Sequence, residues 1–325
     1  MLLLTLVVLV ASLASHAAFV LLGIHDEPIR QWTVGSKAEG KPVLMLGSSL
    51  AYFAMSVSNL SARMDRTVQC YWLPSASTSE LEVLARSAPE RDATVVCVSL
   101  YDLNERIFSD HRAEIVPYTS TIRDLWQTRS DWAFSKKLLA QYPMHYLRVM
   151  FPTAGRSLMV MIAAKAKLLR YRHFLQGRPQ SNVPKAVDFD AETNETIADW
   201  SQAHLLEQVT IVRGICQDTH EFAGPKKRAF IRVLSDAAAR GRVTVIVLPM
   251  SPQYRRALVS EAALKAFEVS LADAHKAVPE STWLRADQMA ALNDSMCFKD
   301  LAHMNSKGKR IVTDAVSGVL VANTR

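Results

Sequence analysis

The residue with the clearest chemical potential is Ser49, which follows a short apolar run over residues 42–46 in a Gly47-Ser48-Ser49 turn. A serine hydroxyl attacks a carbonyl only when a base takes its proton and donors stabilise the resulting oxyanion. A turn between a buried strand and a helix can project such a hydroxyl and aim backbone N–H groups at an anion. A Gly-Ser turn alone is usually only a turn, and Ser48 is the second candidate for the nucleophile.

A base and its partner are available near the C-terminus, where Asp300 and His303 lie three residues apart. This spacing allows the carboxylate to reach one imidazole nitrogen and leaves the other nitrogen for a serine. An isolated Asp-x-x-His is more often a surface pair or a helix cap. The prediction of a triad of Ser49, His303 and Asp300 therefore depends on both motifs lying at strand ends of one sheet.

The order of apolar and amphipathic segments indicates an α/β fold. Strand-like runs alternate with helical segments before residue 105 and again after residue 225, which predicts a three-layer sandwich around a central parallel sheet of about five strands. Functional groups of such sheets gather at the carboxyl ends of the strands. The predicted strands cover residues 42–46, 67–73, 93–100, 243–248 and 282–285, and the main helices cover 50–64, 75–87, 225–240, 261–277 and 308–323.

The chain divides into three predicted regions. Residues 1–23 carry no Lys, Arg, Asp or Glu and are about long enough to cross a bilayer, so we expect a transmembrane anchor, with a cleaved signal peptide as the alternative. Residues 24–41 read as a polar linker. Residues 42–325 form the catalytic domain, and the region 106–222, rich in helical stretches and without a convincing strand, is expected to be a helical insertion.

Composition limits the remaining classes. The net charge is +7, but no basic block is interleaved with aromatics, so we expect no nucleic-acid partner. A solvated basic surface and contact with an anionic membrane or an anionic polymer remain open. No closely spaced Cys/His set is present, so neither a metal nor a cofactor is expected. A disulfide between Cys216 and Cys297 is left open.

These motifs together resemble the SGNH (GDSL-like) hydrolase superfamily. Leu44 to Ser49 is similar to its first block, with Ser48 in place of the usual Asp, and the late Asp300-x-x-His303 is similar to its last block. The resemblance implies that Ser49 is the nucleophile. It also implies an oxyanion hole, for which the candidates are the backbone N–H groups of Ser49 and Ala76 and the side chain of Asn104. The second and third blocks depart from the family pattern.

An apolar N-terminus with these motifs is similar to the anchored SGNH proteins of cell-envelope acylation. That subgroup includes the D-alanyl transfer protein of teichoic-acid D-alanylation and proteins that assist alginate or cellulose O-acetylation. The resemblance implies a serine-dependent O-acyltransferase or esterase on the periplasmic side of a bacterial inner membrane. It further implies a polytopic membrane-bound O-acyltransferase as partner and a cell-envelope glycan or teichoic-type polymer as acceptor. A free-standing anchored esterase or lipase-like hydrolase and a non-catalytic envelope scaffold are the alternatives.

Overall fold

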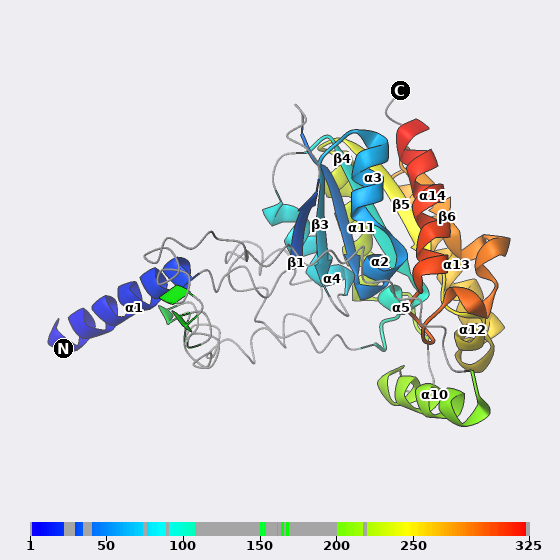
Figure 1. Ribbon diagram of the computed structural model, residues 1–325, viewed down its shortest axis with the longest axis horizontal. Coiled ribbons are helices and arrows are strands. Elements are labelled where there is room, and N and C mark those ends of the chain that lie inside the picture. The colour runs from blue at the N-terminus through cyan, green and yellow to red at the C-terminus, as the bar shows by residue number, and fades with distance from the viewer. Residues whose placement is uncertain are drawn as a thin grey trace.

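The core of the molecule is a six-stranded sheet with the order β1-β3-β2-β4-β5-β6 (Figure 1). Strands β3, β2, β4, β5 and β6 run parallel, and β1 pairs antiparallel with β3 at one edge. This confirms the predicted α/β fold with a parallel five-stranded sheet. The computed structural model describes residues 2–22, 30–34, 41–73, 77–88, 91–107, 200–216 and 220–322, with isolated positions between 150 and 168.

The strands are β1 (Arg30–Val34), β2 (Val43–Ser48), β3 (Val68–Leu73), β4 (Ala93–Ser99), β5 (Arg242–Leu248) and β6 (Thr282–Arg285). The helices are α1 (Leu2–Leu22), α2 (Ser49–Ala54), α3 (Val57–Met64), α4 (Thr78–Ser87), α5 (Leu100–Leu103), α10 (Gln202–Cys216), α11 (Pro225–Ala238), α12 (Pro252–Leu258), α13 (Glu261–Ala277) and α14 (Ser306–Ala322). Three short 3-10 turns, η3 (Ala286–Gln288), η4 (Ala290–Leu292) and η5 (Ser295–Cys297), follow β6.

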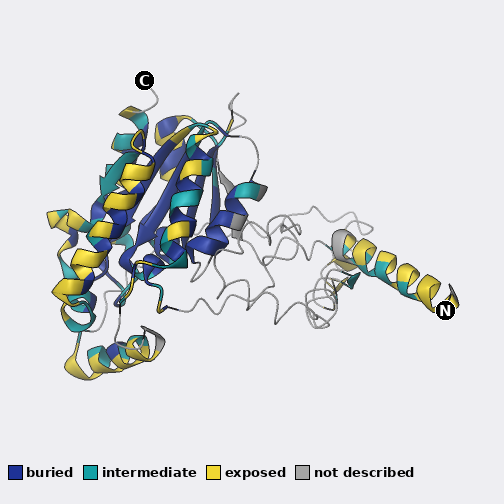
Figure 2. Cartoon of the chain, turned by 180° about the vertical axis from the view of Figure 1, so that it is seen from behind, coloured by how far each residue is buried: buried dark blue, intermediate teal, exposed yellow. Residues whose placement is uncertain are grey.

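The central strands are apolar because helices cover both of their faces. All six residues of β2 are buried, as are the last six residues of both β4 and β5, which is the pattern of a parallel strand inside a three-layer fold. On one face, α14 contacts α2 and α3, and on the other, α11 contacts α4 and α13. Figure 2 shows the buried sheet between helices whose outer sides are exposed.

One predicted helix is divided in the structure. The sequence predicts a single helix over residues 50–64, whereas α2 ends before Met55 and α3 begins after Ser56. Met55 is extended, and the Ser56 hydroxyl accepts a hydrogen bond from the backbone N–H of Asn59 at 3.3 Å. A serine that caps a helix in this way starts a new helix, and this capping signal was missed.

The N-terminal predictions have mixed outcomes. Residues 2–22 form a helix, α1, as expected, but within the part of the chain that is described no helix meets the length and apolarity needed to cross a membrane. The predicted transmembrane character of residues 1–23 is therefore not confirmed. The segment 24–41 was predicted to be a linker, yet it contains β1, which pairs with β3 from Arg30 opposite Trp72 to Val34 opposite Val68. Most of the predicted insertion at 106–222 lies outside the described residues, apart mainly from α10.

Candidate active site

The nucleophile candidate Ser49 is the first residue of α2, directly after β2. The Ser48 hydroxyl caps this helix by accepting a hydrogen bond from the backbone N–H of Leu50 at 3.2 Å. Gly47 is required for the close approach of strand and helix, because a Cβ there would lie 2.5 Å from the Cβ of Ala51. The tight turn leaves Ser49 half-buried while Ser48 is buried. Ser49 is therefore the more accessible of the two adjacent serines.

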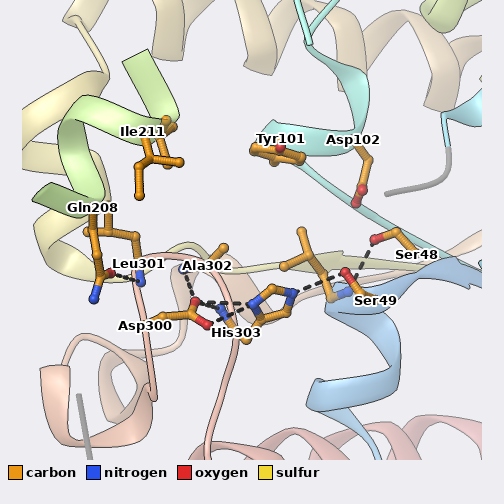
Figure 3. A pocket seen from close by; sticks show the side chains of 12 residues that line it. Ser48, Ser49, Tyr101, Asp102, Gln208, Ile211, Asp300, Leu301, Ala302 and His303 are labelled. Carbon is orange, nitrogen blue, oxygen red and sulfur yellow. Dashed lines mark hydrogen bonds and ion pairs between the residues drawn. The ribbon is translucent and has the colours of Figure 1, made fainter. Parts of the chain in front are cut away.

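Ser49, His303 and Asp300 lie in one hydrogen-bonded line (Figure 3). The Ser49 Oγ is 3.0 Å from His303 Nε2. The other ring nitrogen, Nδ1, is 2.9 Å from Oδ2 and 3.1 Å from Oδ1 of Asp300. A carboxylate in this place holds the tautomer that carries its proton on Nδ1, so Nε2 is left to accept the serine proton. The structure thus brings together the three residues that the sequence predicted as catalytic, although they are 254 residues apart at most.

The backbone of the loop that carries Asp300 and His303 donates hydrogen bonds to the Asp300 carboxylate. Asp300 Oδ1 accepts hydrogen bonds from the backbone N–H groups of Ala302 at 2.8 Å and His303 at 2.7 Å. Burial acts to raise the pKa of Asp300, but the hydrogen bond and charge of the His303 ring and these N–H groups outweigh burial and hold the pKa below its usual value. A carboxylate stabilised in this way remains ionised at neutral pH.

Aromatic packing fixes the imidazole from a third side. The ring of Phe53, on α2, meets the His303 ring edge to face with 4.8 Å between centroids. The ammonium group of Lys299 lies 3.3 Å from the centroid of the Phe53 ring, a cation–π arrangement. The helix that carries the nucleophile therefore also orients the base.

A cavity of about 240 Å³ opens beside the triad. It is lined by the end of β2, the start of α2, α5 just after β4, the loop before α14 and one side of α10 (Figure 3). Half of the lining residues are polar or charged, but most of the surface that they expose to the cavity is apolar, so the cavity suits an apolar group better than a charged one. The lining residues are Ser48, Ser49, Leu50, Tyr101, Asp102, Gln208, Ile211, Val212, Asp300, Leu301, Ala302 and His303.

Asp102 is a buried carboxylate behind the nucleophile turn. Its Oδ2 accepts hydrogen bonds at 2.8 Å from both the backbone N–H and the hydroxyl of Ser99. Burial raises its pKa to about 6, although hydrogen bonds from Ser48 and Ser99 and the positive charge of Lys226 act to lower the pKa. The Asp102 side chain therefore lies beside Ser48.

The predicted oxyanion-hole residues have different placements. The backbone N–H of Ser49 is at the first position of a helix, where no preceding carbonyl of that helix is available to it. Ala76 lies outside the described residues. Asn104 is buried and is not part of the cavity lining; its side-chain oxygen accepts hydrogen bonds from the backbone N–H groups of Arg106 at 3.1 Å and Glu221 at 3.0 Å. The structure does not bring Asn104 to the triad.

Several lining residues were not identified from the sequence. Tyr101 and Asp102 follow β4 directly, so their position at a strand end was the available signal. Gln208, Ile211 and Val212 belong to α10, in the region predicted to be an insertion. No motif distinguishes these three residues, because only the packing of α10 places them beside the triad.

The metal and disulfide predictions can be compared with the described part of the chain. Among those residues, no group of three or more His, Cys, Asp or Glu side chains could hold a metal ion. Cys297 is a free, buried thiol, so the disulfide to Cys216 that the sequence left open is absent.

Comparison with known proteins does not add a family to this description. No protein-family model matches the chain, and a search of curated proteins finds no significant match. The fold shown is α/β, with a central sheet of five parallel strands flanked by helices. Numbered among themselves along the chain, the parallel strands have the order 2-1-3-4-5, which corresponds to β3-β2-β4-β5-β6.

Proposed function

We propose that this protein is a serine-dependent acyl-transfer enzyme of the SGNH type, with Ser49 as nucleophile, His303 as general base and Asp300 as its orienting carboxylate. The observation that carries the proposal is the line of hydrogen bonds from Ser49 Oγ through both ring nitrogens of His303 to Asp300. These three groups come from two ends of the chain, and no single structural purpose explains their alignment beside a cavity. This constellation performs acyl transfer on several unrelated folds.

The proposed reaction has two stages. His303 Nε2 takes the hydroxyl proton of Ser49 as Oγ bonds to the carbonyl carbon of an ester or thioester. The tetrahedral oxyanion collapses, the bond to the leaving alcohol or thiol breaks, and His303 gives that group its proton. In the second stage His303 deprotonates an acceptor hydroxyl, which attacks the acyl-serine, and the proton returns to Ser49 Oγ. The N–H of Ser49 contributes to the oxyanion hole.

The acceptor decides whether the outcome is transfer or hydrolysis. We propose a hydroxyl of a cell-envelope glycan or teichoic-type polymer as acceptor and a polytopic membrane-bound O-acyltransferase as partner, on the basis of the resemblance carried by Gly47-Ser48-Ser49 and Asp300-x-x-His303. A free-standing esterase would use the same acyl-enzyme with water as acceptor. The aligned triad argues against a non-catalytic scaffold. A scaffold does not require a serine hydroxyl that is hydrogen-bonded to a histidine and faces a cavity.

We further propose that α1 holds the chain at the inner membrane, with the catalytic domain on the extracytoplasmic side. The supporting observation is the surface of α1, which carries no charged residue. Its large apolar side chains are exposed, including Leu3 at 75% and Leu4 at 68%. A helix with apolar side chains exposed to this extent needs a lipid phase or another apolar surface to cover it.

The test of the central proposal is covalent labelling of Ser49 by a fluorophosphonate. The full-length protein in detergent should be labelled at pH 7.5, and Ser49→Ala should abolish labelling, because the probe bonds only to an activated serine. His303→Ala should slow labelling by roughly three orders of magnitude or more, since the members of a triad act as a unit. Labelling is read by in-gel fluorescence and by mass spectrometry of the modified peptide.

Two serine variants make this test specific. Ser48→Ala should retain labelling at Ser49, which separates the two adjacent candidates. Ser58→Ala serves as the matched control on α3, because Ser58 is outside the cavity lining. A wild-type protein that folds yet is never labelled would overturn the proposal in favour of the scaffold. For a labelled protein, release of free acid from a p-nitrophenyl ester, with and without an added polyol acceptor, separates hydrolysis from transfer.

A further inference from the structure

The backbone of Leu301 is held by two elements that are distant in sequence from the catalytic loop. Its N–H donates to the side-chain oxygen Oε1 of Gln208 on α10 at 3.1 Å (Figure 3). Its carbonyl oxygen accepts a hydrogen bond from the backbone N–H of Ser251, the N-cap of α12, at 3.2 Å. Leu301, one of the two residues between Asp300 and His303, is thus held through both its backbone N–H and its carbonyl group.

Other N–H groups of this loop are satisfied within the loop itself. Lys299 donates to the carbonyl of His303 at 3.0 Å, and Ala302 and His303 donate to Asp300 Oδ1. Leu301 is 2% exposed, so its N–H depends on Gln208 for a partner that water cannot easily replace. Leaving a buried donor without a partner is costly, and a loop would shift to avoid that cost.

Helix α10 is seated firmly enough to act as a support. Val209, next to Gln208, is 6% exposed and belongs to the hydrophobic core, and Leu205 and Val212 pack against that core. Helix α10 also contacts α12, which supplies the second hydrogen bond to Leu301. The side chain of Gln208 is therefore presented from a packed helix face rather than from a free loop.

From these contacts we infer that Gln208 is a positioning residue for acyl transfer, acting through the Leu301 peptide to hold Asp300 and His303 in line with Ser49. This inference rests on the proposed function. Helix α10 lies between β4 and β5 in the chain and lines the cavity. The inference gives this helix a second role, which is to position the catalytic loop. A displacement of about 1 Å in such an alignment can lower a rate by roughly 100-fold.

The decisive variants are Gln208→Leu and Gln208→Glu. Leucine has a similar size but no acceptor, so kcat for a p-nitrophenyl ester and the rate of fluorophosphonate labelling should both fall by about 10- to 100-fold with little change in KM. Glutamate keeps an acceptor oxygen at the same reach, so it should restore most of the lost rate. Glu207→Gln is the matched control, because the neighbouring Glu207 side chain is 69% exposed and is outside the cavity lining.

Hydrogen exchange provides a readout that does not depend on activity. In the wild-type protein the amide of Leu301 should be protected, and Gln208→Leu should increase its exchange in peptides covering residues 298–304, whereas Gln208→Glu should preserve protection. If the wild type is labelled and Gln208→Leu retains its full rate, the positioning role is wrong. An equal loss of rate in both variants also overturns it, because retention of the acceptor would then be irrelevant.

The two proposals fail in distinguishable ways. A folded wild-type protein that is never labelled at Ser49 contradicts acyl transfer, and the exchange experiment then decides the structural half of the inference alone. Protection of Leu301 that does not respond to Gln208→Leu overturns that half, whatever the activity. Protection that is lost in Gln208→Leu and kept in Gln208→Glu supports it.

Discussion

At the scale of single residues, the site contains two carboxylates with opposite electrostatic surroundings. Asp300 is held in its ionised form by the His303 ring and by backbone N–H groups, which keep its pKa below the usual value. Asp102 is enclosed behind the nucleophile turn, where burial raises its pKa to about 6. The surroundings of Asp300 favour its ionised form, whereas those of Asp102 favour its protonated form. The two groups therefore stabilise the folded protein in different pH ranges.

Asp102→Asn should make the protein relatively more stable at high pH. Because the pKa of Asp102 is raised above its ordinary 3.8 in the folded state, the stabilising contribution of this group is complete below about pH 4 and is lost as the pH rises through about 6. The asparagine variant is neutral throughout and does not suffer this loss. Its free energy of unfolding relative to wild type should therefore rise by up to about 3 kcal/mol between pH 4 and pH 8.

Urea unfolding at several pH values measures this difference, and Asp273→Asn provides a control of opposite sign. Asp273 pairs with Lys227, whose hydrogen bond and charge lower the pKa of Asp273. Its contribution is present at neutral pH and lost as the pH falls below about 4, so its removal should become more harmful as the pH rises. A difference between Asp102→Asn and wild type that is independent of pH would contradict the raised pKa.

At the scale of secondary-structure elements, α10 forms part of the lining of the cavity beside Ser49. Ile211 and Val212 line the cavity, and Ile211 is 58% exposed, so it lies at the mouth. The cavity volume of about 240 Å³ is below the range of roughly 300–1,000 Å³ that holds drug-sized ligands. This size favours a short acyl group over a long lipid chain.

Changes at Ile211 should alter the acyl length that the enzyme accepts. Ile211→Ala should raise kcat/KM for longer p-nitrophenyl esters relative to the acetate, because it enlarges the cavity mouth. Ile211→Trp should lower kcat/KM for the longer esters relative to the acetate. One methylene of the acyl group changes kcat/KM by about 10-fold or more in such a pocket. Thr210→Ala is the control, since Thr210 is exposed and outside the lining. Equal selectivity in all four proteins would mean that the acyl group binds elsewhere.

At the scale of the whole molecule, a charge-free apolar helix precedes a well-packed α/β domain. Large apolar side chains of α1 are exposed, such as Leu6 at 56% and Leu13 at 61%, whereas the sheet of the domain is buried on both faces (Figure 2). The two regions therefore have different requirements for their surroundings. The domain is compatible with water, and α1 is compatible with an apolar phase.

Fractionation of cells tests the role of α1. The full chain should sediment with membranes, resist extraction by high salt and dissolve in detergent, because apolar contacts are not screened by ions. A double variant, Leu6→Lys with Leu13→Lys, should move the protein toward the soluble fraction, since burial of a charge in an apolar phase is unfavourable. Release of the wild type by salt alone would indicate attachment through charge and would contradict the proposal.

Some features of this structure are encoded by short sequence patterns, and others depend on contacts between residues that are distant in the sequence. The parallel sheet follows from continuous apolar runs such as Val43–Leu46 and Val243–Leu248, and the triad follows from two short motifs at strand ends. The role of Gln208 depends on a contact across 93 residues, which no local pattern encodes. The edge strand β1 was also missed, because five mixed residues form a strand only when β3 offers them an edge.

The pairing of β1 with β3 also limits how far the α/β domain can lie from α1. Only eight chain steps separate Leu22, the last residue of α1, from Arg30, the first residue of β1. An extended chain spans at most roughly 3.3–3.6 Å per step, so this edge of the sheet stays within about 30 Å of the end of α1. If α1 is fixed at a membrane, the β1 edge of the sheet must therefore also lie within about 30 Å of the end of α1.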